Sequence, residues 1–413
     1  MNKFEEKYQE DLSKKDFEKL INKSYLSEKE LQVEYVKRGI VLPPKALETK
    51  LSNKVGLQKA LHGKGGVVDS DGNYVELSAQ KAVGMRNRVD GSYKFNHNDL
   101  VIRNEKVIYL NYFIKQWGHF LLDVVGRLWY PLLKDSETKL VYTCYTGTET
   151  KIEGNYLEFL ELLGIDKSRL ILINYPTQFD EIIIPESSIL PGAYYTKEYK
   201  SLFTSVISNI ELDNNELDNK KIYCSRSRLD LAKGKEIGES AIEEIFQRNG
   251  FTSVYMETMS LTEQIKTLLS AKSIVLTSGS LAHNLLFVNK EVDVFILNKT
   301  YRVNLHQFLI NEISEATITF VDIYRSPLPI LYGYGPFLMD ITKPFANFLE
   351  DNKFIYDAGT VLSKRDYFRY YFKWLWSYKF FLFRPNQIKE GNSEFEKSFK
   401  IIRRYYKTGR QYE

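Results

Sequence analysis

The stretch Ser273-Ile-Val-Leu-Thr-Ser-Gly-Ser-Leu-Ala-His-Asn284 decides the fold. An apolar strand pattern ends in Ser278-Gly279-Ser280 and passes directly into a helical pattern, as at the strand–helix junctions of parallel sheets. The first N–H groups of such a helix have no intrahelical partners, and the positive end of its dipole favours an anion. Gly279 would also let the backbone approach a diphosphate closely. A plain turn with serine caps would show the same residues, so this segment alone does not predict a ligand.

Strand and helix patterns alternate on both sides of this junction. The later series has strands at 221–225, 252–255, 273–277 and 293–297 and helices at 239–249, 261–271 and 281–288. The earlier series has strands at 107–110, 139–145, 170–173 and 181–184, helices at 118–133, 156–163 and 202–210, and a hairpin at 66–75. This alternation predicts two α/β units, each with a parallel sheet, joined by a polar linker at 213–220.

The two ends of the chain have other patterns. Residues 1–40 are rich in Lys and Glu with spaced apolar residues, which predicts a helical surface segment that Pro43-Pro44 would end. Residues 367–384 interleave aromatic residues with Lys and Arg. We therefore expect a helical appendage at 1–45, a first α/β domain at 46–212, a second at 213–340, and an aromatic, basic helical tail at 341–413.

Composition excludes several classes of protein. The chain has 413 residues, enough for two domains, with hydrophobic and charged fractions of 43% and 27% that are typical of globular proteins. Cys144 and Cys224 are too few for a disulfide framework and fit a reducing compartment. Residues 1–10 carry no apolar secretory signal, and no apolar run approaches the roughly 18 residues of a spanning helix. We expect a cytoplasmic protein that is not integral to a membrane.

Two arginines follow the strand pattern at 221–225, in the run Ser225-Arg226-Ser227-Arg228. Sheets of this class bind ligands at the carboxyl ends of their parallel strands, and a planar guanidinium matches phosphate oxygens in pairs. Together with the Gly279 turn, Arg226 and Arg228 predict a site for a nucleoside diphosphate. A pair of solvated loop charges is the alternative.

In the first unit the most informative run is Trp117-Gly-His-Phe-Leu-Leu-Asp-Val-Val-Gly-Arg-Leu-Trp129. Residues four apart share one face of a helix, so His119, Asp123 and Arg127 would form a polar stripe between apolar flanks. Such a stripe near the ligand edge of a sheet would suit proton transfer. The alternative is an Asp123–Arg127 ion pair with His119 as a neighbour, which would have only a structural role.

These runs resemble glycosyltransferase family 61, as found in bacterial capsular polysaccharide proteins. The run at 117–129 is similar to the family's Gly-His-Phe/Trp-Leu-Leu-Asp/Glu-x-x-x-Arg-Leu-Trp signature. In the second unit the resemblance rests on Ile222-Tyr-Cys-Ser-Arg226, Met259-Ser-Leu-Thr-Glu-Gln-Ile265 and Asn284-Leu-Leu-Phe287. The similarity covers about residues 65 to 297. The family usually has His-Gly-Ala-Gly where this chain has Ser278-Gly-Ser-Leu281, so Ser278 replaces the usual histidine.

The resemblance implies an inverting glycosyltransferase that moves a hexosyl or pentosyl group from a nucleotide sugar to a growing capsular or exopolysaccharide glycan. It also implies two Rossmann-like domains facing a cleft, the GT-B arrangement, with the acceptor in the first domain and the donor in the second. The donor-binding residues would be Ser225, Arg226, Arg228, Ser278, Gly279, Ser280, His283 and Asn284. His283, one helical turn after Gly279, would either compensate for the missing histidine or only cap or pack.

An inverting transfer needs a base for the acceptor hydroxyl and positive groups for the leaving diphosphate. We expect Asp123 to be the base, with His119 orienting it or contacting the acceptor. Because Arg127 nearby would lower the basicity of Asp123, His119 is the second candidate for the base. The Asp-x-Asp run Asp69-Ser70-Asp71 lies in the hairpin turn, so we expect no metal and no cofactor besides the donor.

The tail bears on the partners of the protein. Residues 364–413 contain thirteen Lys/Arg and five Asp/Glu. This predicts either an interfacial helix on an anionic membrane, at the inner face of the plasma membrane, or a helix packed on a domain. The acceptor would then be a glycan or a lipid-linked glycan. No nucleic-acid fold signature accompanies the basic residues, so nucleic acid is not an expected partner.

Two other functions are weighed against sugar transfer. A non-catalytic partner in polysaccharide assembly, which binds a nucleotide sugar or a glycan, would explain the missing turn histidine. A nucleotide-sugar epimerase or a kinase fits less well, because the Walker pattern and the Gly-x-Gly-x-x-Gly fingerprint are both absent from the sequence.

Overall fold

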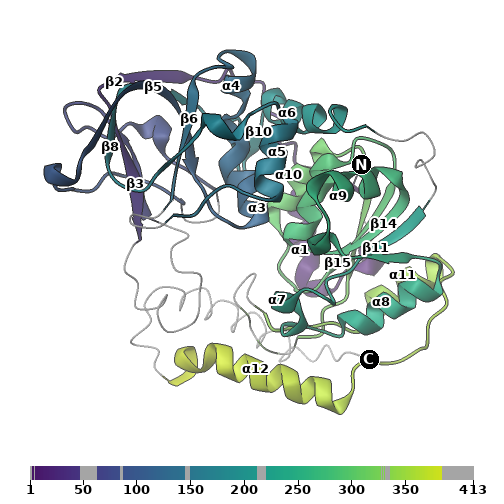
Figure 1. The fold of residues 1–413 in the computed structure, drawn as a ribbon. Coiled ribbons are helices and arrows are strands. Elements are labelled where there is room, and N and C mark those ends of the chain that lie inside the picture. The colour runs from purple at the N-terminus through teal and green to yellow at the C-terminus, as the bar shows by residue number, and fades with distance from the viewer. Residues whose placement is uncertain are drawn as a thin grey trace.

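The computed structural model describes residues 2–3, 5–46, 63–83, 87–144, 149–211, 220–326, 328, 330 and 335–383. Within these ranges two large β-sheets stand beside each other, with helices around and between them (Figure 1), and two further sheets have two strands each. The predicted α/β class is therefore confirmed. The predicted linker at 213–220 lies outside the described residues, apart from Lys220 at the start of a strand, and so does the tail beyond residue 383.

The second sheet is wholly parallel. Its strands are β1 (Asn2–Lys3), β11 (Lys220–Cys224), β13 (Thr252–Val254), β14 (Ala271–Thr277), β15 (Asp293–Asn298) and β16 (Thr317–Asp322). They lie in the order β1-β16-β15-β14-β11-β13, with every pairing parallel. Chain order reverses between β11 and β14. Ligands of doubly wound sheets bind at the carboxyl ends of the strands where this reversal occurs.

Helices cover both faces of this sheet. They are α8 (Glu239–Arg248), α9 (Leu261–Ser270), η8 (Ser280–Phe287), α10 (Leu305–Ile313) and α11 (Lys343–Asp351). Tyr223 and Val275 pack with α8 and α11 on one face. The next residues, Cys224 and Leu276, point to the other face, where α9, η8 and α10 lie. The period of two along each strand thus divides the core between two helical layers.

The first sheet is mixed. Its strands are β2 (Val33–Lys37), β3 (Ile40–Ala46), β4 (Gly63–Val68), β5 (Val101–Tyr112), β6 (Lys139–Thr143), β7 (Leu170–Ile173) and β8 (Thr177–Pro185). The predicted strands fall in β5 to β8, which pair in parallel. The pairs β2–β8, β3–β4 and β3–β8 are antiparallel. The first unit therefore departs from the wholly parallel sheet that we expected.

The N-terminal region corrects the prediction of a helical appendage at 1–45. In the described residues of this region, only α1 (Asp11–Ile21) is a regular helix. β1 joins the second sheet, and β2 and β3 join the first. Phe17 on α1 is fully buried against Phe308 and Phe320. Pro43-Pro44 does not end a helix but lies in β3 where the register shifts, a position that needs no ladder N–H.

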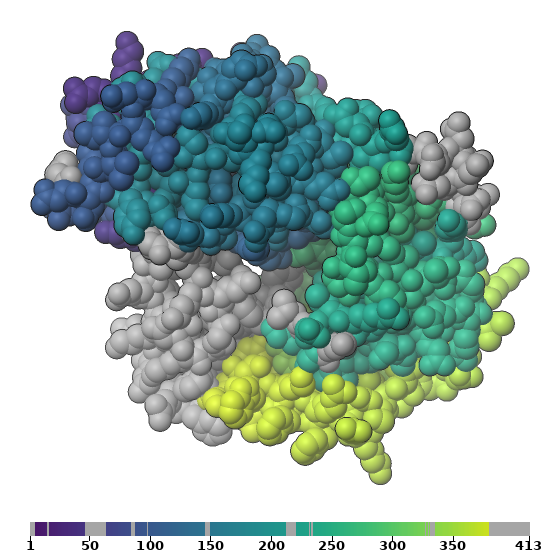
Figure 2. Space-filling view, viewed as in Figure 1, coloured from purple at the N-terminus to yellow at the C-terminus, as the bar shows by residue number. Residues whose placement is uncertain are grey.

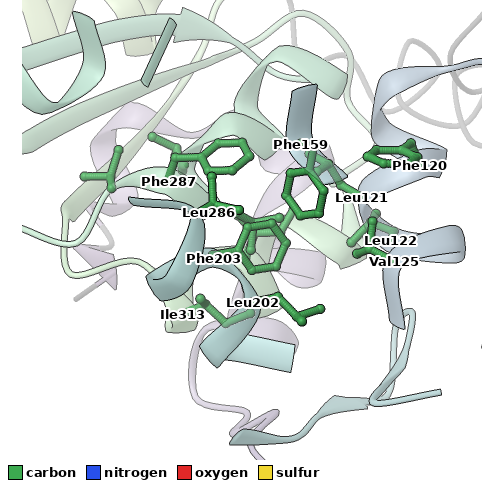
Figure 3. Packing of buried hydrophobic residues seen from close by; sticks show 14 of the residues in the cluster. Phe120, Leu121, Leu122, Val125, Phe159, Leu202, Phe203, Leu286, Phe287 and Ile313 are labelled. Carbon is green, nitrogen blue, oxygen red and sulfur yellow. The ribbon is translucent and has the colours of Figure 1, made fainter. Parts of the chain in front are cut away.

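The two units share one apolar core. The segment α3 (Trp117–His119), η4 (Phe120–Val124), η5 (Val125–Arg127) and α4 (Trp129–Leu133) packs against α5 (Asn155–Leu162), α6 (Lys197–Ser208) and η8. Figure 3 shows Phe120, Phe159, Phe203 and Phe287 meeting there. The ring centroids of Phe203 and Phe287 lie 5.5 Å apart. Aromatic packing therefore fixes the helix of the first unit against the Gly279 junction of the second.

Short elements complete the described chain. They are β9 (Ile189–Leu190), β10 (Tyr194–Tyr195), β12 (Glu236–Ile237), β17 (Phe337–Leu338), α7 (Asp230–Lys233), η1 (Glu6–Tyr8), η2 (Glu76–Ser78), η3 (His97–Asp99), η6 (Lys167–Arg169) and η7 (Met256–Thr258). The pairs β9–β10 and β12–β17 form the two-stranded sheets. The tail forms α12 (Lys364–Phe383), which packs on β12 and β17. None of the helices in the described ranges combines the length and the apolar character that crossing a bilayer requires.

Candidate active site

The helix that carries His119 and Asp123 is irregular. Gln116 caps it, since its Oε1 accepts the backbone N–H of His119 at 2.7 Å. The chain then widens into the π-helical turn η4 and tightens into the 3₁₀ turn η5. A π turn has more residues than an α turn, so it changes which later residues share a face. His119 and Asp123 stay together, whereas Arg127 turns away from them.

His119 and Asp123 form a hydrogen-bonded pair. Nδ1 of His119 lies 2.6 Å from Oδ2 of Asp123, and Nε of Arg88 lies 3.2 Å from the same oxygen. The Asp123 side chain is almost wholly buried, whereas that of His119 keeps 22% of its surface exposed. Burial opposes ionisation of Asp123, but the His119 hydrogen bond and the Arg88 charge outweigh it and lower the pKa of this carboxyl. No residue of the described ranges bonds to Nε2 of His119.

Arg127 does not pair with Asp123. It is buried and donates to the carbonyl groups of Leu77, Ala79 and Leu110 and to Oδ1 of Asn111. The predicted alternative of an Asp123–Arg127 ion pair is therefore wrong. Arg88, from the loop before β5, supplies the cation instead, and sequence reasoning missed it because no motif surrounds it.

Two buried histidines lie beside this pair. Burial, with repulsion from neighbouring histidines, lowers the pKa of His283 to about 3. Burial likewise lowers the pKa of His306 to about 4. Both are therefore neutral near pH 7. Nε2 of His283 lies 3.3 Å from the Asn304 amide, which fixes the ring.

The two signature runs touch each other. Nε2 of Gln116 donates to Oγ of Ser280 at 2.5 Å, and Nε1 of Trp117 donates to Oδ1 of Asn284 at 2.5 Å. Gly118 lies so close to η8 that a Cβ there would meet Nδ1 of His283 at 2.8 Å and Oγ of Ser280 at 3.0 Å. Three of the predicted donor-binding residues, Ser280, His283 and Asn284, thus lie against the residues that directly precede His119.

Cations gather where strand order reverses. Glu236 on β12 is buried and binds Nζ of Lys299 at 2.7 Å and Nε of Arg226 at 3.1 Å. Lys299 follows β15, and Arg226 follows β11. Burial opposes the charge of Glu236, but these two cations outweigh it and lower the pKa of the carboxyl. A second carboxylate, Glu239, accepts the backbone N–H of Arg226 at 2.5 Å. Burial raises the pKa of Glu239 to about 7, so near pH 7 it carries only part of a negative charge against the two cations.

The Gly279 turn borders this cluster. Gly279 has φ +133°, and its Cβ position would lie 3.7 Å from Nζ of Lys299. No side chain caps η8, and within the described ranges the N–H groups of Ser280 and Leu281 have no backbone acceptor. Backbone N–H donors and the side chains of Arg226 and Lys299 therefore lie together at the carboxyl ends of the strands. Such a set of groups suits the binding of phosphate.

Residues 117–295 match the family model Glycosyltransferase 61. The matched region runs from Trp117 of α3 to Phe295 of β15, so it contains both the His119–Asp123 pair and the Gly279 turn. It supports family 61 and, with it, a glycosyltransferase. No match to a curated protein was found.

Two of the predicted donor-binding residues of this glycosyltransferase 61 region are engaged elsewhere. Oγ of Ser225 donates to Glu243 at 2.8 Å. The Arg228 guanidinium lies over the Tyr255 ring, 3.8 Å from its centroid. Both contacts lie towards β13, away from the Gly279 turn. Lys299, which was not among the predicted donor-binding residues, lies beside that turn. Ser278 itself accepts the backbone N–H of Lys299 at 3.5 Å.

A cavity lies beside Asp123, and its wall combines residues of the matched region with residues that precede it. Its volume is about 150 Å³, and its wall includes Gln80, Asn111, Asp123 and Arg127. Side-chain amides of Gln80 and Asn111 hold the Asp123 carbonyl at 2.8 and 3.0 Å. Such polar walls suit hydroxyl groups. Among the described residues no group of three His, Cys, Asp or Glu side chains is arranged to hold a metal ion, and metal independence stays a prediction.

Proposed function

We propose that this protein transfers a hexosyl or pentosyl group, with inversion and without a metal, from a nucleotide-sugar donor to a hydroxyl group of a growing cell-surface glycan. The observation that carries the proposal is the contact between α3 and η8. There Gln116 and Trp117, which precede His119, bond to Ser280 and Asn284, which follow Gly279. The family 61 match supplies the reaction class.

The donor's diphosphate would lie at the switch point of the second sheet. Nε of Arg226 binds Glu236, but the terminal nitrogens of its guanidinium have no partner among the described residues. These nitrogens, Lys299 and the N–H groups of Ser280 and Leu281 would bind the phosphate oxygens. As the glycosidic bond breaks, negative charge grows on the diphosphate, and the same groups would stabilise it.

The acceptor hydroxyl would lose its proton to His119. The Nδ1–H of His119 donates to Asp123, so the lone pair on Nε2 of His119 is free to accept a proton. Asp123 itself is a weaker candidate than we expected, since it is buried and Arg88 lowers its basicity. We therefore assign the base to His119 and the orientation of His119 to Asp123. The hydroxyl oxygen attacks the anomeric carbon, the bond to the diphosphate breaks, and the proton moves to Nε2.

The test has two stages. Thermal-shift screening of a nucleotide-sugar panel should find one class that raises the melting temperature, because a ligand selective for the folded state stabilises it. Transfer from that donor to glycan acceptors is then measured by release of the nucleoside diphosphate. Release that depends on an acceptor supports the proposal, and a chain that binds no nucleotide sugar contradicts it.

A non-catalytic binding partner in polysaccharide assembly is the second candidate. Ser278 favours it, because the resemblance places a histidine at that position. His283 supports transfer instead, since it lies one turn after Gly279 and against Gly118. The second candidate would be supported if the protein binds a nucleotide sugar but transfers its sugar to no acceptor. In that case Lys299→Met should still weaken the binding of the nucleotide sugar.

A further inference from the structure

Helix α12 has two apolar faces, and within the described part of the chain only one of them packs against other elements. Tyr370, Trp374 and Tyr378 are buried against Ile237, Leu338 and Leu362. These three aromatic residues are four apart, so they occupy one stripe of the helix. This face attaches α12 to β12, the strand that also carries Glu236.

The opposite face presents large apolar side chains to solvent. Phe368 is 71% exposed, Trp376 66% and Phe372 60%, with Tyr371 and Leu375 also exposed. No other element of the described chain has more than two exposed side chains of this kind. Monomeric soluble proteins rarely leave such a cluster uncovered, so a partner for this face is expected. Figure 2 shows α12, in yellow, along the lower edge of the molecule.

Basic residues border the exposed aromatic residues. The described helix carries Lys364, Arg365, Arg369, Lys373 and Lys379 against a single acidic residue, Asp366. Arg365 and Lys379 fall on the same side as Phe368 and Phe372, and Nζ of Lys379 lies 3.7 Å from the centroid of the Trp376 ring. Aromatic rings at the headgroup level with cations beside them are typical of helices that lie in the membrane interface.

We propose that the outer face of α12, formed by Phe368, Tyr371, Phe372, Leu375 and Trp376, docks on an anionic lipid bilayer. The rings insert at the boundary between headgroups and acyl chains, and the basic residues bind the lipid phosphates. The positive charge selects an anionic bilayer over a second copy of this chain, which would bring like charges together. The sequence predicted either an interfacial helix or a helix packed on a domain. In this proposal one face of α12 packs on the protein and the opposite face lies on the membrane.

The test is co-sedimentation of the full chain with vesicles, which needs neither donor nor acceptor and is independent of sugar transfer. Vesicles of phosphatidylcholine and phosphatidylglycerol in equal parts should sediment the protein, and pure phosphatidylcholine should do so more weakly. Phe368→Ser with Trp376→Ser should lower the partition coefficient roughly tenfold or more, because two apolar anchors are lost. Arg365→Ser should lower it roughly fivefold.

The matched control is Ile102→Ser with Tyr175→Ser, which removes two exposed apolar side chains of the first unit. It should leave the partition coefficient unchanged, and all variants should keep the melting temperature because the replaced side chains are exposed. Equal sedimentation of the wild-type chain and the α12 variant would overturn the proposal. Release of the protein from the vesicles by a single-stranded oligonucleotide would also overturn it. The same holds if the wild-type chain self-associates and the α12 variant does not.

Discussion

The two halves of the candidate site are built differently. In the first unit, His119 and Asp123 depend on a network drawn from distant segments, with Arg88 as the cation. In the second unit, Arg226, Gly279 and Lys299 come together because each follows a strand of one parallel sheet. The order of the strands is enough to bring the residues of the second half together. The residues of the first half come together only through the packing of side chains from distant segments. In the proposed reaction the first half would hold the proton acceptor in place, and the second would bind the phosphates of the donor.

The largest expected effect breaks the first half alone. His119→Ala should lower kcat by roughly 10²–10⁴-fold, because the acceptor proton would lose its base. Donor affinity should stay unchanged, since the cations of the second half remain. Transfer rates and calorimetric nucleotide binding would separate the two effects.

Asp123→Asn is the companion variant of His119→Ala. As a positioning change it should lower kcat less and alter the pH–rate profile, because the carboxylate that orients and stabilises the His119 imidazolium is lost. Near wild-type turnover in His119→Ala, together with an inactive Asp123→Asn, would return the base to Asp123.

The second half is tested by Lys299→Met. Loss of one charge-assisted contact should weaken donor binding by about 10- to 100-fold. Once donor is saturating, kcat should fall less than it does in His119→Ala. Lys272→Met, an exposed lysine at the opposite end of β14, is the control and should bind donor normally. Equal donor affinity in both variants would remove Lys299 from the site.

Gly118→Ala tests the contact between the halves. The new Cβ would meet Nδ1 of His283 at 2.8 Å, so we expect a loss of about 1–3 kcal/mol in unfolding free energy. Gly234→Ala is the control, because its Cβ would meet only the flexible end of Lys373. Denaturant unfolding measures both variants. A Gly118→Ala chain as stable as the control would show that α3 and η8 are not tightly docked.

The last prediction concerns the dependence of stability on pH. Burial lowers the pKa of His283 from 6.5 to about 3, so between these values the unfolded chain binds more protons than the folded chain. Stability conferred by the neutral ring is therefore complete above pH 6.5 and is lost as the pH falls towards 3. The slope for one such group is at most about 1.4 kcal/mol per pH unit. In His283→Gln this part of the slope should disappear, and an unchanged slope would place the titration elsewhere.

Local patterns predicted the second half well because strand ends need no remote information. The patterns at 221–225 and 273–277 correctly placed Arg226 and Gly279 at one edge of the sheet. The same rule, applied to the strand at 293–297, would have pointed to Lys299. Ser225 and Arg228 also follow β11, yet their contacts lie on the β13 side, which spacing does not reveal.

The first half and the N-terminus were predicted less well, for two physical reasons. The π turn at 120–124 rotates Arg127 away from Asp123, and a helical wheel assumes that no such turn occurs. β2 is a strand because it pairs with β8, about 150 residues later in the chain, and local periodicity contains no such information.

A crystal structure with the nucleoside diphosphate that most raises the melting temperature tests the central claim most directly. The account predicts the diphosphate at the carboxyl ends of β11 and β14, within hydrogen-bonding distance of Arg226, Lys299 and the N–H groups that follow Gly279. A nucleotide bound elsewhere, with these groups still paired only among themselves, would contradict it.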